Sequence, residues 1–203
     1  MKKVSWILVA VFMVVLIGGA GVLYNHFSGQ VENDRLMTED YSQAQIEEET
    51  EEETEESTEE ELVMAPDFTV YDKDGNAVSL SDFIGKPTVV NFWASWCGPC
   101  QMEMPDFDKK YKELGEEIYF LMVNMTDGAQ ETLETAKKFV EESGYSFPVY
   151  YDTDVDAAMT YGVSSIPSTY FIDSEGHAIA WAQGMIDAET LQTGIDMIKE
   201  EKE

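Results

Sequence analysis

The sequence predicts an α/β domain with a mixed central sheet over residues 65–203. Two continuous apolar runs, 87–93 and 117–124, are typical of central strands that are buried on both faces. Helical segments alternate with these strands, and the chain then forms a strand hairpin and a closing helix. Such an order indicates a sheet that contains both parallel and antiparallel strands.

Each element of this domain has a local signal. Ser81 and Asp82 are typical of a cap before a short helical turn that runs through Ile84. Gly144 and Gly162 each stand where a helix is expected to end. Strands are expected at 68–71, 87–93, 117–124, 147–151, 168–173 and 177–183, and helices at 99–114, 130–143, 154–161 and 187–199.

Residues 1–24 predict a membrane anchor. Two lysines precede an apolar run from Val4 to Tyr24, and about 20 apolar residues span a hydrocarbon core. Lysines before the run and acids after it place the N-terminus in the cytoplasm and the rest of the chain outside. A cleaved signal peptide is the alternative, because small residues at 18–20 offer a cleavage site. In either case we expect the domain to be extracytoplasmic, held at the cell membrane by a single pass if the segment is uncleaved.

Residues 25–64 predict an acidic, disordered linker. Eleven of the fifteen residues from 47 to 61 are Glu, and apolar residues are too sparse to offset the entropy of ordering. Mutual repulsion should extend this run, which is either a tether that holds the domain off the membrane or a spacer without a role of its own. The formal net charge of −29 excludes nucleic acid as a partner, because little would neutralise its phosphates.

Cys97 and Cys100 are the only cysteines of the chain. Their spacing places the sulfurs about one helical turn apart, so they can close a small disulfide ring and carry two electrons and two protons. Half of a zinc site is the alternative, but zinc takes four ligands. The chain has no second cysteine pair, and its histidines are His26 and His177. We therefore expect no metal and no cofactor beyond the redox-active disulfide.

Several segments together resemble a known family. The domain opens with APDF, continues through SLSDFIGKP and VVNFWASWCGPC, and later contains QMEMP and GVSSIPSTYFID. In this element order, residues 65–203 resemble thioredoxin-like proteins, and in particular the extracytoplasmic TlpA/ResA group of membrane-anchored thiol–disulfide oxidoreductases. The resemblance implies a thioredoxin-like fold with an N-terminal extension and a central inserted helix and strand, preceded by one transmembrane helix.

The resemblance implies a role for each residue of the cysteine motif. Cys97 would be the nucleophile at the N-terminus of a helix, where the dipole and free N–H groups favour the thiolate. Cys100 would be the resolving thiol. Gly98 would leave room for a substrate backbone, and Pro99 suits a first helical turn. Trp96 would shield the cysteines and form part of the docking surface.

Two further segments belong to the implied site. Ile166-Pro167 resembles the cis-proline loop beside the cysteines, and an ordinary turn proline is the alternative. Glu103 lies on the same helix face as Cys100. In the resembling group a Glu here tunes proton transfer, so a buried carboxyl with a raised pKa would accept the proton of Cys100. A solvated helix charge is the alternative. Asn91 stands where thioredoxin has a buried Asp, which leaves Glu103 as the expected acid–base group.

These expectations favour a disulfide reductase, because Ile166 and the pair Gly98-Pro99 match thioredoxin more than the oxidants. Its partners would be exported proteins with disulfides, such as apocytochrome c or thiol-dependent repair enzymes, and a membrane electron donor of the CcdA/DsbD type. We expect a monomer. A disulfide-forming oxidase would use the same residues in the opposite direction. A peroxiredoxin-type thiol peroxidase needs Pro and Thr/Ser where this chain has Val90 and Ala94, and a non-catalytic binding module is a further alternative.

Overall fold

The computed structural model describes residues 62–199 of the chain. The anchor predicted at 1–24 and nearly all of the linker predicted at 25–64 lie outside the described residues and stay predictions. Within 62–199, no helix combines the length and the apolar character needed to cross a membrane. The fold begins slightly before residue 65, because Met64 pairs with His177 in an isolated bridge.

The described residues form one mixed sheet of seven strands. Its order is β2-β1-β5-β4-β3-β6-β7. The central strand β3 pairs parallel with β4 and antiparallel with β6, which confirms the predicted mixed sheet. The strands are β1 (Thr69–Tyr71), β2 (Ala77–Ser79), β3 (Thr88–Trp93), β4 (Tyr119–Asn124), β5 (Val149–Tyr151), β6 (Ser168–Ile172) and β7 (Ala178–Gln183).

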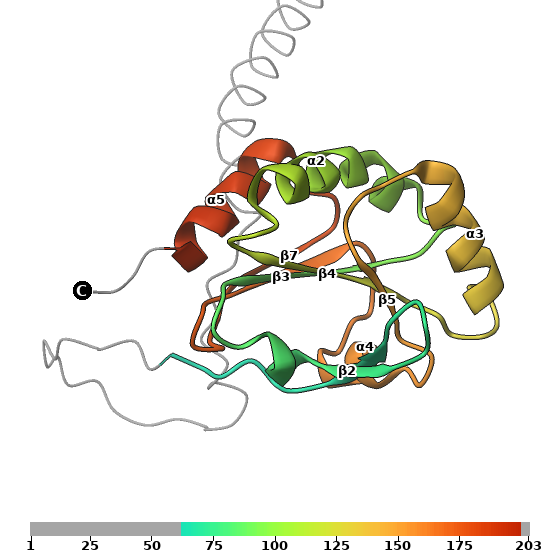
Figure 1. The fold of residues 1–203 in the computed structure, drawn as a ribbon, viewed down its shortest axis with the longest axis horizontal. Helices are drawn as coiled ribbons and strands as arrows, with labels where there is room; N and C mark the ends of the chain where they lie inside the picture. Colours follow the sequence, from blue (N-terminus) through green and yellow to red (C-terminus); the bar gives the residue numbers. More distant parts are fainter. Residues whose placement is uncertain (1–61, 200–203) are drawn as a thin grey trace, which may run out of the picture. The chain divides into compact units, whose positions relative to one another are not determined.

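Helices cover both faces of the sheet. Figure 1 shows α2, α3 and α5 on one side and the 3-10 helix η1 and α4 on the other. All predicted strands and helices are present with shifted ends, and β2 is a further strand that the sequence does not predict. The helices are η1 (Leu80–Phe83), α2 (Gly98–Leu114), α3 (Leu133–Ser143), α4 (Asp156–Thr160) and α5 (Ala188–Lys199).

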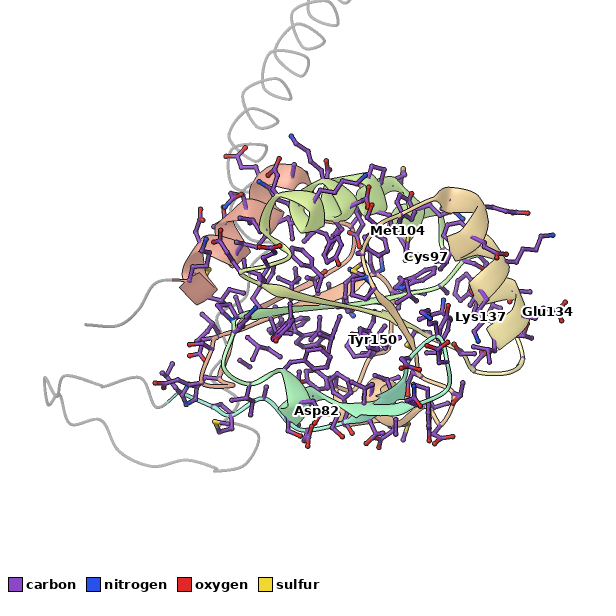
Figure 2. The ribbon with its side chains drawn as sticks, in the orientation of Figure 1. Asp82, Cys97, Met104, Glu134, Lys137 and Tyr150 are labelled. Atoms are coloured by element: carbon purple, nitrogen blue, oxygen red, sulfur yellow. A yellow bond between two sulfur atoms is a disulfide. The ribbon has the colours of Figure 1, made fainter. Side chains whose placement is uncertain are left out.

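The core consists of two apolar layers, one on each face of the sheet. Val89 belongs to the layer under α2 and α5, and its neighbour Val90 belongs to the opposite layer. Both are fully buried, as the continuous apolar run of β3 predicts. From α2, Met104 and Phe107 are buried in the first layer, and Figure 2 shows Met104 on the same side of the sheet as Cys97.

Helix α5 packs closely against the sheet at Gly194. A Cβ atom at this position would lie 2.3 Å from ring atoms of Phe171, a fully buried residue of β6. The missing side chain therefore lets the helix backbone pack directly against the aromatic ring. This contact holds α5, and the loop that precedes it, against the active-site side of the sheet.

Candidate active site

The cysteine pair lies where β3 leads into α2. Cys97 is the N-cap residue of α2, and Cys100 lies one turn inside the helix. Their sulfurs form a disulfide with a Cα–Cα distance of 5.3 Å. Cys97 retains 4% exposure, whereas Cys100 has none. Cys97 is therefore the more accessible residue of the pair.

The helix N-terminus provides an environment that favours negative charge on Cys97. Its Sγ accepts the backbone N–H of Cys100 at 3.2 Å. Pro99 occupies the first turn, where its missing N–H leaves no donor unpaired. Within α2, which is described in full, the first turn contains no acidic residue to oppose the charge. Once the disulfide is reduced, the amide and the helix dipole would stabilise a thiolate on Cys97.

The cis-proline loop lies beside this sulfur. The Ile166–Pro167 peptide bond is cis, which confirms the expectation and rules out an ordinary trans turn. The carbonyl oxygen of Ile166 is 3.8 Å from Cys97 Sγ, and the disulfide sulfur has no hydrogen to donate, so this is a packing contact. The Ser168 hydroxyl donates to the carbonyl of Ser165 at 2.8 Å. The loop thus presents backbone next to the more accessible cysteine.

Exposed residues flank the disulfide. Trp96 is 49% exposed, and Gly98 and Pro99 are exposed beside it. No heavy atom lies within 4 Å of the position that a Cβ of Gly98 would take. A substrate backbone therefore has room there. Met102, one turn further along α2, extends this apolar surface with 63% exposure, and the sequence reading had not assigned it to the site.

Glu103 is enclosed beneath the active-site helix. Glu103 is 1% exposed, so the alternative of a solvated charge on the helix surface is wrong. One carboxylate oxygen accepts the side-chain N–H of Asn91 at 2.9 Å, and the other accepts the backbone N–H of Ile186 at 3.0 Å. Burial raises the pKa of Glu103 from 4.5 to about 7, although both hydrogen bonds lower it. The group is thus poised to exchange a proton near neutral pH.

Asn91, in β3, connects Glu103 to the neighbouring strand β6. Its Nδ2 donates to Glu103 Oε1 at 2.9 Å and to Thr169 Oγ1 at 3.0 Å, and both Asn91 and Thr169 are fully buried. Its Oδ1 is buried without a hydrogen-bond partner. The sequence reading identified Asn91 only as a neutral replacement and missed Thr169 and Ile186. These contacts join residues 78 and 83 positions apart, which no local pattern reveals.

A second buried carboxylate supports the loop before Cys97. Glu131 is 1% exposed and accepts the backbone N–H of Ser95 and the hydroxyl of Thr135. The carbonyl of Ser95 in turn accepts the side-chain N–H of Gln101. The backbone N–H and the carbonyl of Ser95 are therefore both bonded to side chains. The sequence reading did not identify Glu131, because its partner in the loop lies 36 positions away.

Metal ligands do not gather elsewhere in the described part of the chain. Across residues 62–199, no three His, Cys, Asp or Glu side chains are arranged so that they could hold a metal ion. His177 instead contacts Asp173 at 3.0 Å within the turn between β6 and β7.

The domain is similar to a known protein family, to curated proteins and to solved structures. The AhpC/TSA family model matches residues 63–180. Thiol–disulfide oxidoreductase ResA of Bacillus thuringiensis subsp. konkukian (strain 97-27) is 39% identical over 131 residues, which cover 63% of this chain and 72% of that protein. ResA of Bacillus subtilis (strain 168) is 32% identical over 136 residues, covering 66% and 74%. The solved exposed lipoprotein thioredoxin of Streptococcus pneumoniae strain TIGR4 is 34% identical with a TM-score of 0.57, covering 64% of this chain and 99% of that one.

Proposed function

Because the chain belongs to the AhpC/TSA family and is a ResA-like thiol–disulfide oxidoreductase of thioredoxin fold, we propose that it reduces disulfide bonds of exported proteins. One observation carries this proposal. A disulfide joins a sulfur at a helix N-terminus, which touches the cis-proline loop, to an enclosed sulfur one turn deeper in the helix. This arrangement assigns different tasks to the two cysteines.

The reaction begins with both cysteines reduced. The Cys97 thiolate attacks one sulfur of a substrate disulfide, forms a mixed disulfide and displaces the first substrate thiolate. Cys100 then loses its proton to Glu103, and its sulfur attacks Cys97 and displaces the second substrate thiolate. Two electrons have passed to the substrate, each substrate thiolate takes up one proton, and the enzyme is left with the Cys97–Cys100 disulfide.

Glu103 suits the task of proton acceptor. It follows Cys100 by three positions, so both side chains lie on one face of α2, and both are buried. A carboxyl with a pKa of about 7 can both take up and release a proton near neutral pH. The hydrogen bonds from Asn91 and Ile186 hold its two oxygens in place.

The enzyme would work outside the cytoplasm. The apolar run of residues 1–24 supports a single-pass anchor in the cell membrane with the N-terminus in the cytoplasm, and the acidic run after it supports an extended tether. The pneumococcal relative is described as an exposed lipoprotein, which supports the same location. Exported proteins such as apocytochrome c or thiol-dependent repair enzymes would be the substrates. A membrane electron donor of the CcdA/DsbD type would reduce the disulfide again, and the enzyme would act as a monomer without a further cofactor.

The equilibrium reduction potential of the full-length protein tests the direction of the reaction. We expect a potential near or below that of thioredoxin, which is about −270 mV, in dithiothreitol or glutathione buffers. The Cys100→Ser variant is the control, because it cannot form the ring and should show no two-electron transition. A potential near that of a strong oxidant, about −120 mV, would instead assign the protein to disulfide formation.

The peroxidase alternative gains no support from the site. Ala94 occupies the position where a peroxiredoxin has Thr or Ser, and it is fully buried without a hydroxyl group. Val90, in the position of the required Pro, packs in the core on the far face of β3. Positions 90 and 94 therefore lack the Pro and the hydroxyl group that a peroxiredoxin uses next to its reactive cysteine.

A further inference from the structure

Glu131 is the second buried carboxylate near the cysteine pair, and the proposed reaction gives it no task. One of its oxygens accepts the backbone N–H of Ser95, the residue before the exposed Trp96. We propose that Glu131 is a positioning residue, which acts through Ser95 to fix the backbone that carries Trp96 and so favours protein disulfides over small ones. The inference rests on the proposed function, in which an exported protein docks beside Cys97 and its disulfide is reduced there.

Residues 94–97 form a single turn, the active-site turn, between β3 and α2. The carbonyl of Ala94 accepts the backbone N–H of Cys97 at 3.1 Å, which leaves Ser95 and Trp96 at the two central positions. Cys97 is also held from the helix, because it is the N-cap residue of α2. Ser95 and Trp96 belong neither to β3 nor to α2, so contacts from other segments decide how the turn is held.

The direction of the Trp96 side chain depends on this turn. Trp96 is 49% exposed, and none of the aromatic ring contacts within residues 62–199 involves it. Trp93 and Trp181, by contrast, pack against the rings of Phe139 and Tyr170. The backbone of the active-site turn therefore determines where the Trp96 ring meets a partner protein.

Two side chains hold the backbone of Ser95 from opposite ends of its peptide groups. Glu131 accepts the N–H of Ser95, and Gln101 donates its side-chain N–H to the carbonyl. Gln101 is exposed, so water has access to its bond, whereas Glu131 is only 1% exposed. The bond to Glu131 is therefore the harder of the two to replace.

Glu131 is itself fixed at both of its backbone groups. Its N–H donates to Asp127 Oδ1 and its carbonyl accepts the N–H of Gly128, each at 2.9 Å. It directly precedes Thr132, the N-cap residue of α3, and its second carboxylate oxygen accepts the hydroxyl of Thr135. The start of α3 thus provides a fixed base from which the carboxylate reaches the active-site turn.

This role requires the length of the Glu131 side chain and not its charge. Both carboxylate oxygens accept neutral donors, the N–H of Ser95 and the hydroxyl of Thr135. Gln has the same length, and its carbonyl can accept from Ser95 while its NH₂ donates to the Thr135 oxygen. The hydroxyl hydrogen of Thr135 can then turn to the carbonyl of Thr132, 2.9 Å away. Asp keeps the charge but is shorter by one carbon–carbon bond, about 1.5 Å, so its carboxylate withdraws from Ser95.

Single-turnover reduction by the pre-reduced full-length protein tests this role with two probes. Insulin is a protein with disulfides, and dithiodipyridine is a small neutral disulfide that needs no docking surface. In Glu131→Asp the rate with insulin should fall by about 10-fold, since a misplacement of about 1 Å can cost up to about 100-fold where orientation matters. The rate with dithiodipyridine should stay unchanged. Glu131→Gln should match the wild-type protein with both probes.

Trp96→Ala, a substitution at the surface, provides a second test. It should also slow the reduction of insulin, and adding Glu131→Asp should cause no further loss, because both changes act on the same docking contact. Asp152→Asn is the matched control. Asp152 is also 1% exposed and accepts the backbone N–H groups of Ala157 and Ala158 in α4, on the opposite side of the sheet from α2 in Figure 1. This variant should lower the free energy of unfolding and leave both rates unchanged.

Four results would overturn the proposal. An unchanged insulin rate in Glu131→Asp would leave Glu131 without a positioning role, and an equal loss with both probes would place its effect at the cysteines. A loss in Glu131→Gln would make the charge the requirement. Additive losses in the double variant with Trp96→Ala would show that Glu131 does not act through Trp96.

The proposed direction of the reaction is tested separately by the reduction potential. If that potential is near that of a strong oxidant, the direction is wrong. The same variants are then compared in the reverse reaction, in which the oxidised protein acts on reduced ribonuclease or on a small thiol. The docking surface is the same in both directions, so the loss in Glu131→Asp should again be confined to the protein probe, and a loss with both probes would again overturn the role of Glu131.

Discussion

Replacing Glu103 by Gln should change how the stability of the oxidised protein depends on pH. In the folded protein the pKa of this carboxyl is raised from 4.5 to about 7, chiefly by burial. The folded state therefore binds the Glu103 proton more tightly than the unfolded state. Gln has nearly the same size and carries no titrating group, so the variant removes this linkage and keeps the side-chain volume.

The sign and the size of the effect follow from proton linkage. Between pH 4.5 and 7 the folded state holds more protons, so the free energy of unfolding falls as the pH rises. One pKa unit corresponds to about 1.4 kcal/mol, and a shift of about 2.5 units therefore gives about 3 kcal/mol. Because Glu103 is 1% exposed, solvent screening does not reduce this figure much. The stabilisation is complete below pH 4.5 and is lost as the pH passes 7.

Urea unfolding of the full-length protein at a series of pH values between 4.5 and 8.5 measures this difference. Relative to Glu103→Gln, the wild-type protein should lose about 3 kcal/mol across the range. Glu134→Gln is the matched control, because Glu134 is exposed on α3 and points away from the domain in Figure 2. Its curve should run parallel to that of the wild type. A Glu103→Gln curve that is also parallel would refute the assignment of a raised pKa to the buried carboxyl.

Three other substitutions have distinct expected outcomes. Gly194→Ala should lower the free energy of unfolding by about 1–3 kcal/mol in urea titrations, because the new Cβ would overlap the ring of Phe171, and a gain in stability from helix propensity would contradict that packing. Asp108→Ala should cost about 1–3 kcal/mol in the same assay, since the backbone N–H of Ser146 loses its acceptor, and an unchanged midpoint would show that water replaces it. Cys100→Ser should accumulate a mixed disulfide with substrate on non-reducing gels, and the absence of a dithiothreitol-sensitive adduct would contradict its role as the resolving thiol.

The main elements of the fold could be predicted because their signals are local. The run 87–93 has no polar face, and it forms β3 at the centre of the sheet. Gly144 adopts a left-handed conformation at the end of α3, where the sequence predicts a helix end. The strand β2 was missed, because its three residues pair with β1 only after the turn between them has formed. Residues 77–79 lack the aromatic residues of the equally short β1 and β5, so only the pairing with β1 identifies them as a strand.

The candidate site divides in the same way. The cysteine motif is contiguous, so its chemistry follows from residue type and spacing, and the cis bond at Pro167 is confirmed in its expected place. Glu131 was missed because its partner Ser95 belongs to another element. The burial of Glu103 could be offered only as one of two alternatives. The local sequence around a helical Glu does not show whether that residue faces solvent or the core.

The sequence by itself determined that this chain has an α/β domain with one redox-active cysteine pair, because strand and helix patterns and a four-residue motif are local. Only the tertiary structure decided what surrounds that pair. The state of Glu103 depends on Asn91, 12 positions before it, and on the backbone of Ile186, 83 positions after it. Burial raises its pKa, and hydrogen bonds from distant strands and loops oppose that rise. These opposing effects exist only after α2, β3 and the segment before α5 have packed together.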